Sequence, residues 1–281
     1  MSQHRTTVVD VFTATALTGN PVAVVHDAQG LSDAQMAAYA RWTNLSETTF
    51  LLPPTDPKAD YRLRIFTPER ELPFAGHPTL GSCHAWLAAG GQPKGEVVVQ
   101  ECGVGLVRVR RDGARLAFAA PPLKRSGDID AETLAKVARA LCIEPQAIRA
   151  AAWVDNGPGW LAVMLGSRDE VLALAPDFEA MKPLEVGVVA PWPAEGVNGE
   201  RCAFEVRAFV PSLGIPEDPV TGSLNAGLAQ WLVGSGRAPS SYVASQGTAM
   251  GRAGRVHVDR DGEDLWIGGD CVRCIEGTLT L

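Results

Sequence analysis

Two short motifs, one in each half of this 281-residue chain, constrain its fold more than any other feature. Residues 77–82 read His-Pro-Thr-Leu-Gly-Ser, and residues 218–223 read Asp-Pro-Val-Thr-Gly-Ser. The motifs align without a gap, 141 residues apart, and a helix-like apolar run follows each one. Internal self-similarity of this kind is typical of chains built from repeated structural units. The sequence therefore predicts two similar lobes that face each other, each with an equivalent helix.

The rest of the chain consists mainly of short strand-like segments separated by turn signals. Residues 61–67 mostly alternate between apolar and polar side chains, and Gly19-Asn20-Pro21 is a turn signal. Helices are predicted at 33–43, with Ser32 as N-cap, and at 130–141. Many strands and few helices favour an α+β fold, in which each lobe is a mostly antiparallel sheet curled around its motif helix. We place the lobes at residues 1–120 and 121–281, with the boundary near Pro121-Pro122.

Composition narrows the class of protein. Apolar residues make up 46% and charged residues 20% of the chain, so a packed core is expected. The net charge of −7, without a basic cluster, argues against a nucleic-acid partner. No apolar run approaches membrane-spanning length and no signal-peptide pattern is present, so we expect a cytoplasmic protein with no membrane partner.

Sequence motifs for metals and cofactors are missing as well. Six cysteines are scattered, and only Cys271 and Cys274 are close in sequence; we interpret them as small residues of a sheet rather than as metal ligands. The chain has no phosphate loop, dinucleotide fingerprint or Gly-x-Ser-x-Gly. These motifs therefore give no indication of a metal or an organic cofactor.

The two motifs suggest a binding site for an acid. A proline after His77 and after Asp218 fits the first turn of a helix, where its missing N–H costs nothing. Free backbone N–H groups near Gly81-Ser82 and Gly222-Ser223 are then predicted to bind a carboxylate, and two such helix ends in one cleft suit a small acidic metabolite. The plainer alternative is that Asp218 only caps a helix and His77 is a satisfied loop histidine.

Other acidic residues near the motifs are less informative from spacing alone. Glu47 lies between a predicted helix and an apolar strand, where a solvated loop residue is expected. In an apolar cleft, the same carboxylate could instead transfer protons. Arg70 and Glu71 are predicted in a solvated turn, and Glu217 is predicted to be exposed beside Asp218.

Five segments together resemble the PhzF, or phenazine-biosynthesis-like, family within the diaminopimelate-epimerase-like fold. They follow the family order and span both halves. The segments are 9–12 (Val-Asp-Val-Phe), 19–24 (Gly-Asn-Pro-Val-Ala-Val), 44–48 (Asn-Leu-Ser-Glu-Thr), 66–79 (from Phe-Thr-Pro to Gly-His-Pro-Thr) and 217–223 (Glu-Asp-Pro-Val-Thr-Gly-Ser).

The resemblance implies a function that spacing alone does not give. It implies two pseudo-symmetric lobes, a last strand at about residues 271–281 that can return to the first lobe, and usually a homodimer. It implies an isomerase that moves a proton without cofactor or metal, as in the family member that isomerises trans-2,3-dihydro-3-hydroxyanthranilate on the way to phenazines. By this analogy Glu47 is the general acid/base, and His77 and Asp218 bind and polarise the substrate. The further substrate contacts are Gly76, Thr221, Gly222 and Ser223.

Two other functions remain open at this point. The same cleft could serve a protein that binds a small acid without catalysis. A cysteine-dependent epimerase or racemase is the other alternative, and it requires two facing thiols. Cys83 lies one turn inside the predicted motif helix and is expected to be packed in the core.

Overall fold

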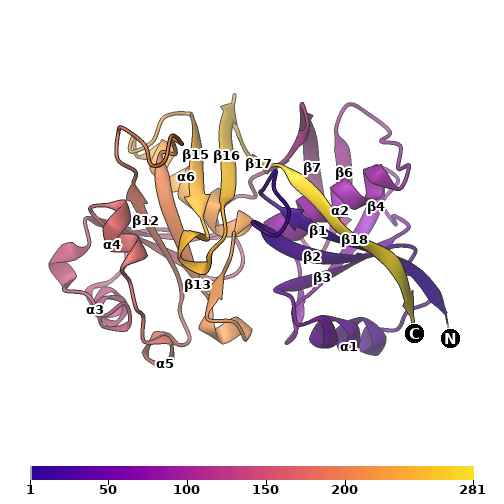
Figure 1. Cartoon of the computed structure of the whole chain (residues 1–281), viewed down its shortest axis with the longest axis horizontal. Coiled ribbons are helices and arrows are strands. Elements are labelled where there is room, and N and C mark those ends of the chain that lie inside the picture. Colours follow the sequence, from indigo (N-terminus) through magenta and orange to yellow (C-terminus); the bar gives the residue numbers. More distant parts are fainter. Residues whose placement is uncertain (1) are drawn as a thin grey trace. The chain divides into compact units, whose positions relative to one another are not determined.

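The chain forms two compact units in the computed structural model, which describes residues 2–281. Unit 1 extends to Ala119 and also contains Gly268–Leu281, and unit 2 is Ala120–Ile267. The return of the C-terminus to unit 1 is made by β18 (Cys271–Thr280), which pairs antiparallel with β1 (Gln3–Val11) along the length of that strand. Figure 1 shows these two strands side by side and the two chain ends together.

Unit 1 is a sheet of mostly antiparallel pairs. The antiparallel pairs are β1–β2, β3–β4, β4–β5, β6–β7 and β7–β8, while β2–β3 and β4–β6 are parallel. The pair β4–β5 is formed by Ile65 with Leu72 and Phe66 with Glu71. The remaining elements of this unit are β2 (Asn20–Val25), α1 (Asp33–Thr43), β3 (Glu47–Leu52), β4 (Tyr61–Phe66), β5 (Glu71–Leu72), α2 (Gly76–Ala88), β6 (Val98–Cys102), β7 (Gly105–Asp112) and β8 (Arg115–Ala119).

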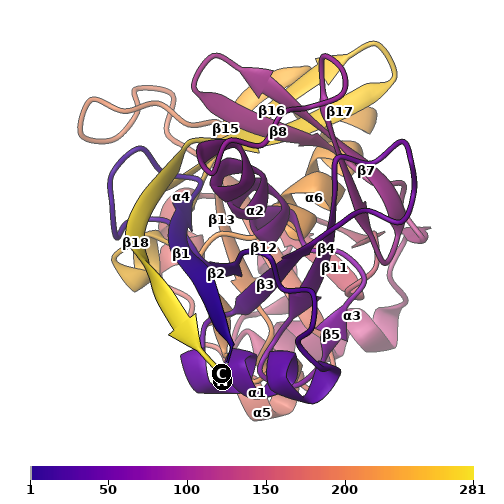
Figure 2. The same ribbon diagram turned by 90° about the vertical axis from the view of Figure 1, so that its right-hand side faces the viewer.

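Helix α2 lies inside the curl of this sheet. It contacts β1, β2, β3, β4, β6, β8 and β18, and Figure 2 shows it between these strands. Most of its residues are buried, in keeping with its apolar sequence all round. Gly81 is required for the close approach, because a Cβ there would lie 2.3 Å from Cγ1 of Val22 and 2.9 Å from Cγ2 of Val11. Helix α2 is therefore the core element that the sequence predicted for this lobe.

Unit 2 has the same plan. Antiparallel pairs join β9–β10, β10–β11, β12–β13, β13–β14 and β15–β16, and β11–β12 and β13–β15 are parallel. Helix α6 contacts β10, β11 and β16. The elements are β9 (Arg125–Gly127), α3 (Ala131–Ala140), β10 (Ala150–Asp155), β11 (Trp160–Met164), α4 (Arg168–Leu172), α5 (Phe178–Met181), β12 (Glu185–Pro191), β13 (Phe204–Phe209), β14 (Glu217–Asp218), α6 (Gly222–Gly234), β15 (Ser241–Gln246), β16 (Gly254–Asp261) and β17 (Asp264–Gly269), which leads back into unit 1.

The repeat is real, but its register differs from the gapless alignment of the two motifs. Both core helices have 13 residues, and they begin at Gly76 and at Gly222. Helix α2 thus begins five residues before Gly81, which lies in its second turn and is not a helix start. His77 therefore corresponds to Ser223. Asp218 corresponds to Leu72, since each ends the two-residue strand before its helix.

A bidentate ion pair is repeated in the same register. Arg64 Nε and Nη2 donate to the carboxylate of Glu71 at 2.7 and 2.6 Å, and Arg207 Nε and Nη2 donate to Glu217 at 2.9 and 2.7 Å. Each pair joins the short strand before a core helix to its neighbour in the sheet. The prediction that Glu217 is exposed was wrong: its side chain is 10% exposed, because the buried guanidinium of Arg207 holds it against β13.

The α+β fold class is confirmed by this architecture and by solved structures of the same fold. Local signals also held, since Ser32 and Gln35 form a capping box at the start of α1, and Asp130 caps α3. Among residues 2–281, we find no helix that is both long and apolar enough to span a membrane.

Candidate active site

In unit 1, Glu47 and His77 form a carboxylate–imidazole pair. Glu47 Oε2 lies 3.5 Å from His77 Nε2, and the two side chains are 13% and 3% exposed. Glu47 is the first residue of β3, after Asn44 ends helix α1 in the left-handed conformation, and it lies opposite Val22 in the parallel pair β2–β3. Glu47 is thus at a sheet end and largely buried, rather than in a solvated loop.

His77 is the second residue of α2, and its ring is held from both sides. Nδ1 lies 3.2 Å from the side-chain nitrogen of Asn20, at the start of β2. Burial lowers the pKa of His77 to about 3, and a hydrogen bond to the backbone of Pro21 opposes this shift only in part. His77 is therefore a neutral imidazole at pH 7, with one nitrogen as donor and the other as acceptor. The sequence analysis placed Asn20 in a turn signal and in segment 19–24 of the family pattern, without a role of its own.

The N-terminus of α2 offers backbone donors beside this pair. Its N-cap is Ala75, which provides no side-chain hydrogen bond, and its first turn contains no acidic residue. Gly76 is the first helical residue and is buried. An uncapped helix start carries free N–H groups and positive partial charge, which suits an anion.

In unit 2, Asp218 and Thr221 are joined by a hydrogen-bond network. Thr221 Oγ1 donates to Asp218 Oδ2 at 2.6 Å. The side chain of Gln246 binds the backbone of both residues, accepting from Thr221 N at 3.0 Å and donating to Asp218 O at 3.1 Å. Asp218 is not the cap of α6: the N-cap is Thr221, and no side chain caps that helix. Both residues are buried, so the network fixes the carboxylate at the start of the helix.

Gly222 and Ser223 begin α6, and strand residues from the same unit position Ser223. Trp160 Nε1 donates to Ser223 Oγ at 3.0 Å, and Asn156 Nδ2 donates to Ser223 O at 2.8 Å. Trp160 begins β11 and contacts Ser223, as Asn20 begins β2 and contacts His77, so the two units place their helix starts against equivalent strands. Sequence reasoning missed Trp160, Asn156 and Gln246, which carry no local signal of their own.

The structure does not support donors near Gly81-Ser82 or the cysteine-dependent alternative, and it confirms that Cys83 is packed in the core. Ser82 is fully buried and its hydroxyl contacts that of Thr49 at 2.8 Å, so the second turn of α2 presents no donors to a ligand. Cys83 has no exposed surface, and burial raises the pKa of its thiol to about 12. Burial also raises the pKa of Cys271. Neither thiol has the low pKa of a catalytic cysteine, which disfavours a cysteine-dependent racemase.

Comparison with known proteins identifies the family of this chain. The model of the PhzC–PhzF family, described as phenazine biosynthesis-like protein, matches residues 9–277. The chain belongs to this family. It is 38% identical to antisense-enhancing sequence 1 of Schizosaccharomyces pombe, over 99% of each chain. It is 34% identical to trans-2,3-dihydro-3-hydroxyanthranilate isomerase of Pseudomonas aeruginosa, over 92% of this chain and 91% of that protein.

Solved structures of family members agree with the fold. A phenazine biosynthesis protein of the PhzF family from Enterococcus faecalis superimposes with a TM-score of 0.81 over the full length of both chains, at 27% identity. The expected family and the expected enzyme class, an isomerase, are both confirmed by these relatives. The roles of Glu47, His77 and Asp218 stay predictions.

Proposed function

We propose that this family member isomerises a small carboxylated metabolite by moving one proton, with Glu47 as general acid/base and without a cofactor. In the first step the Glu47 carboxylate takes a proton from a substrate carbon, and the electron pair of that C–H bond enters the conjugated system of the substrate. In the second step the carboxylic acid formed at Glu47 returns the proton to another carbon. Substrate and product therefore have the same composition.

The observation that carries the proposal is the buried Glu47–His77 pair at 3.5 Å beside an uncapped helix start. A carboxylate shielded from water is a stronger base than one in solution, which suits abstraction from carbon. His77, kept neutral by burial, can hydrogen-bond to the substrate without adding a charge. The N–H groups of the first turn at Gly76 supply donors for the substrate carboxylate.

We further propose that the motif of unit 2 acts on the same substrate molecule. Asp218 would accept from a hydroxyl or amino group of the substrate, while its other contacts hold it in place. Ser223 and the free N–H groups at Gly222 would bind a second polar group, and Thr221 would fix the orientation of Asp218. Support comes from the equal length of the two core helices and from the lack of a side-chain cap on either.

The substrate that we put forward first is trans-2,3-dihydro-3-hydroxyanthranilate, the compound in the name of the Pseudomonas aeruginosa relative. It carries the groups for which the two motifs have partners: a carboxylate, an amine and a hydroxyl. The panel of compounds to be tested also contains related cyclic acids, which carry either two hydroxyl groups or an amino group, and amino acids that can be epimerised.

Incubation in heavy water tests the proton transfer. We expect deuterium to enter one panel compound in the presence of wild-type protein, and Glu47→Gln to reduce the rate by at least about 100-fold, the usual size of general acid–base effects. Glu69→Gln, which removes an exposed carboxylate between β4 and β5, is the matched control and should be as active as wild type. Incorporation that survives in Glu47→Gln would refute the assignment of the base.

The alternative, a protein that binds a small acid without turnover, is separated by the same variants. It requires Glu47→Gln to keep full affinity and no compound to be deuterated by wild type. Deuteration by wild type separates the two, because calorimetry should show affinity kept in Glu47→Gln and reduced in Asp218→Asn under either hypothesis, whereas only the enzyme has turnover to lose.

A cytoplasmic homodimer is the assembly that we propose from the family resemblance. Light scattering should then give about twice the chain mass of 29.8 kDa. A mass equal to that of one chain at micromolar concentration would refute it.

A further inference from the structure

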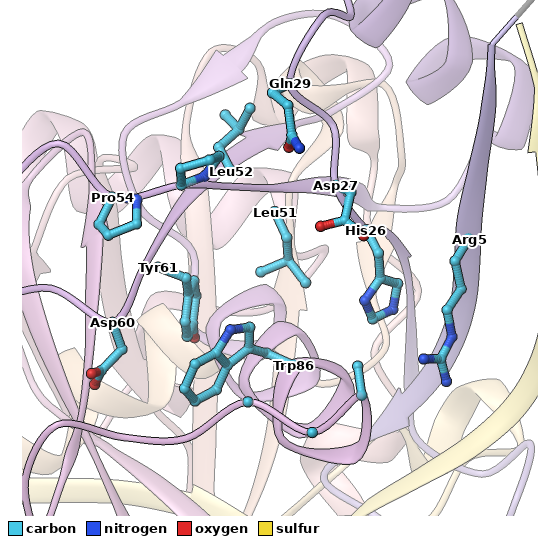
Figure 3. Close-up of a pocket in the computed structure, with 14 residues that line it drawn as sticks. Arg5, His26, Asp27, Gln29, Leu51, Leu52, Pro54, Asp60, Tyr61 and Trp86 are labelled. Atoms are coloured by element: carbon cyan, nitrogen blue, oxygen red, sulfur yellow. The ribbon is translucent and has the colours of Figure 1, made fainter.

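Unit 1 contains a pocket of about 370 Å³ that is separate from the Glu47–His77 pair. It lies at the C-terminal end of α2, where Ala89, Gly90 and Gly91 line it, whereas His77 is in the first turn of that helix. Its volume is in the range of small-molecule sites. Figure 3 shows its lining residues, which come from β1, the β2–α1 loop, β3, β4 and α2.

One wall of the pocket is aromatic and apolar. The rings of Tyr61 and Trp86 lie 5.2 Å apart between centroids, and Figure 3 shows both rings beside Leu51 and Leu52. The backbone of Gly91 packs closely against the indole, since a Cβ there would lie 2.3 Å from Cδ2 of Trp86. Tyr61 is buried and donates to Gln100 at 3.1 Å. A rigid wall of this kind can bind the apolar body of a ligand without first ordering side chains.

The charges around the pocket are mainly negative. Arg5 is paired with Glu276 at 2.5 Å, so these two charges largely cancel. Asp60, a second carboxylate in the lining, accepts from the backbone N–H groups of Lys94 and Val99 at 2.9 and 2.7 Å.

Two further groups at the pocket favour a positive charge. They are the carboxylate of Asp27 and the C-terminal end of α2. Asp27 is exposed, and no donor to its carboxylate is present among residues 2–281. The ring of His26 stands beside it, fixed by a contact of 3.0 Å between its Nε2 and Thr7 Oγ1. Burial lowers the pKa of His26, so it adds no charge at pH 7. The C-terminal end of α2 has negative partial charge, and no basic residue lies in its last turn.

We infer that this pocket binds a small organic ammonium ion, with its apolar body against Trp86 and Leu51 and its cationic group at Asp27. The carboxylate of Asp27 and the carbonyl end of α2 both favour a positive charge there. Anions are disfavoured by Asp27 and Asp60, and a purely apolar ligand would leave Asp27 without a partner. The site does not depend on the proposed isomerisation, because it shares no residue with the two motifs.

Calorimetric titration with 2-phenylethylamine, which is protonated at pH 7, tests the inference against its neutral analogue 2-phenylethanol. We expect the amine to bind wild type and the alcohol to bind at least about fivefold more weakly, the size of one exposed charge interaction. Asp27→Asn should weaken the amine to the level of the alcohol. Asparagine also suits this position, because Asp27 has a positive φ of 50° that asparagine tolerates.

Two control variants separate the pocket from other effects. Asp128→Asn removes an exposed carboxylate from unit 2 and should leave the affinity for the amine unchanged. Glu47→Gln should also bind the amine as wild type does, whether or not it has lost isomerase activity. Equal affinities for amine and alcohol, an unaltered affinity in Asp27→Asn, or no binding of the amine at all would each overturn the inference.

Discussion

His77 Nε2 faces Glu47 Oε2 at 3.5 Å, and yet the imidazole is kept neutral by its burial. A solvent-exposed pair at this distance would favour the imidazolium form of histidine. Here desolvation outweighs that attraction, since the ring is 3% exposed. The pair is therefore suited to a base next to a neutral hydrogen-bonding group, rather than to a salt bridge.

The first prediction concerns stability at acid pH. The pKa of His77 falls from an unfolded value of 6.5 to about 3 in the folded protein. Above pH 6.5 both states are neutral and His77 contributes no pH dependence. Below pH 6.5 the unfolded chain binds a proton that the folded protein does not, so stability is lost as the pH falls from 6.5 towards 3. At about 1.4 kcal/mol per pH unit, the loss is about 2 kcal/mol at pH 5.

Replacing His77 by glutamine isolates this contribution. Urea unfolding gives the free energy of unfolding at pH 7 and at pH 5. Between these pH values it should fall by about 2 kcal/mol more in wild type than in His77→Gln. The buried His26 and the half-buried His84, whose pKa values are also lowered, contribute equally to both proteins. An identical pH dependence in the two proteins would mean that Glu47 stabilises the charged imidazole after all.

Structural features that depend on residues close together in the chain could be predicted from the sequence, whereas features that depend on distant residues could not. The cap of α1 at Ser32 and the strand patterns follow from neighbouring residues, and they were predicted. The free N–H donors of α2 were predicted near Gly81, about one turn too late, whereas this glycine is needed for contact with Val22, 59 positions away in the chain. Asn20 and Trp160 reach their partners through sheet pairing, so only the family pattern could have drawn attention to Asn20.

The second prediction uses the glycines that pack the two core helices. Gly81→Ala would place a Cβ 2.3 Å from a methyl group of Val22, and Gly227→Ala would place one 2.3 Å from the backbone oxygen of Val154. Both should destabilise by about 1–3 kcal/mol, with the larger effect at Gly227 because a backbone oxygen cannot rotate away.

Gly234, the last residue of α6, is the control for this pair. A Cβ there meets no heavy atom within 4 Å, so Gly234→Ala should stabilise by about 0.4–1 kcal/mol. The urea midpoints of the three variants, each compared with that of wild type, test these changes in stability. A Gly227→Ala protein as stable as wild type would contradict the close packing of α6 on β10.

The third prediction compares the two repeated ion pairs. In unit 2 the side chains of Arg207 and Glu217 are 8% and 10% exposed, and Arg207 also donates to the carbonyls of Val171 and Leu174. Arg207→Met strands a buried carboxylate and should cost about 3–5 kcal/mol. In unit 1 Arg64 and Glu71 are 21% and 42% exposed, so Arg64→Met should cost no more than about 1 kcal/mol.

A double variant shows whether the stranded charge is the cause. Arg207→Met with Glu217→Gln removes the uncompensated charge and should recover more than half of the stability lost in Arg207→Met alone. If both arginine variants lose the same free energy of unfolding, burial does not distinguish the two pairs and the argument fails.

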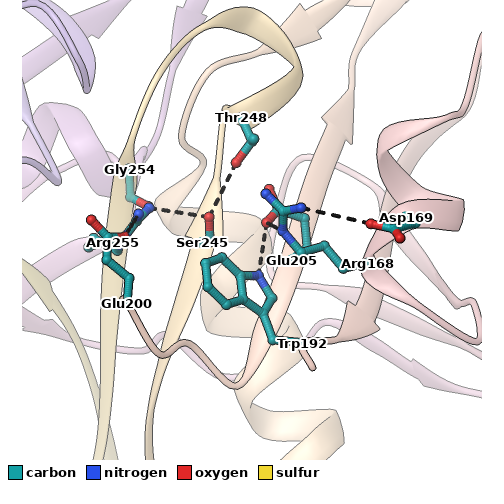
Figure 4. Close-up of polar contacts among 9 residues, drawn as sticks. All are labelled: Arg168, Asp169, Trp192, Glu200, Glu205, Ser245, Thr248, Gly254 and Arg255. Carbon is teal, nitrogen blue, oxygen red and sulfur yellow. Dashed lines mark hydrogen bonds and ion pairs between the residues drawn. The ribbon is translucent and has the colours of Figure 1, made fainter. Parts of the chain in front are cut away.

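The fourth prediction concerns Glu205, whose side chain has no exposed surface. Arg168 Nε and Trp192 Nε1 donate to its Oε2 at 3.2 and 2.9 Å, and the guanidinium lies 5.0 Å from the Trp192 ring (Figure 4). Arg168→Met leaves this carboxylate with only the indole donor and should cost about 3 kcal/mol. Arg255→Met, which breaks the more exposed pair with Glu200 in the same view, should cost no more than about 1 kcal/mol.

Thermal unfolding separates a charge effect at Glu205 from a packing effect. Glu205→Gln in the Arg168→Met background keeps the acceptor for Trp192 Nε1 and removes the buried charge, so it should raise the melting temperature above that of Arg168→Met. The loss of aliphatic packing by Arg168 is common to both proteins and cancels in this comparison. Equal melting temperatures would show that Arg168 stabilises unit 2 by covering Trp192, not by neutralising Glu205.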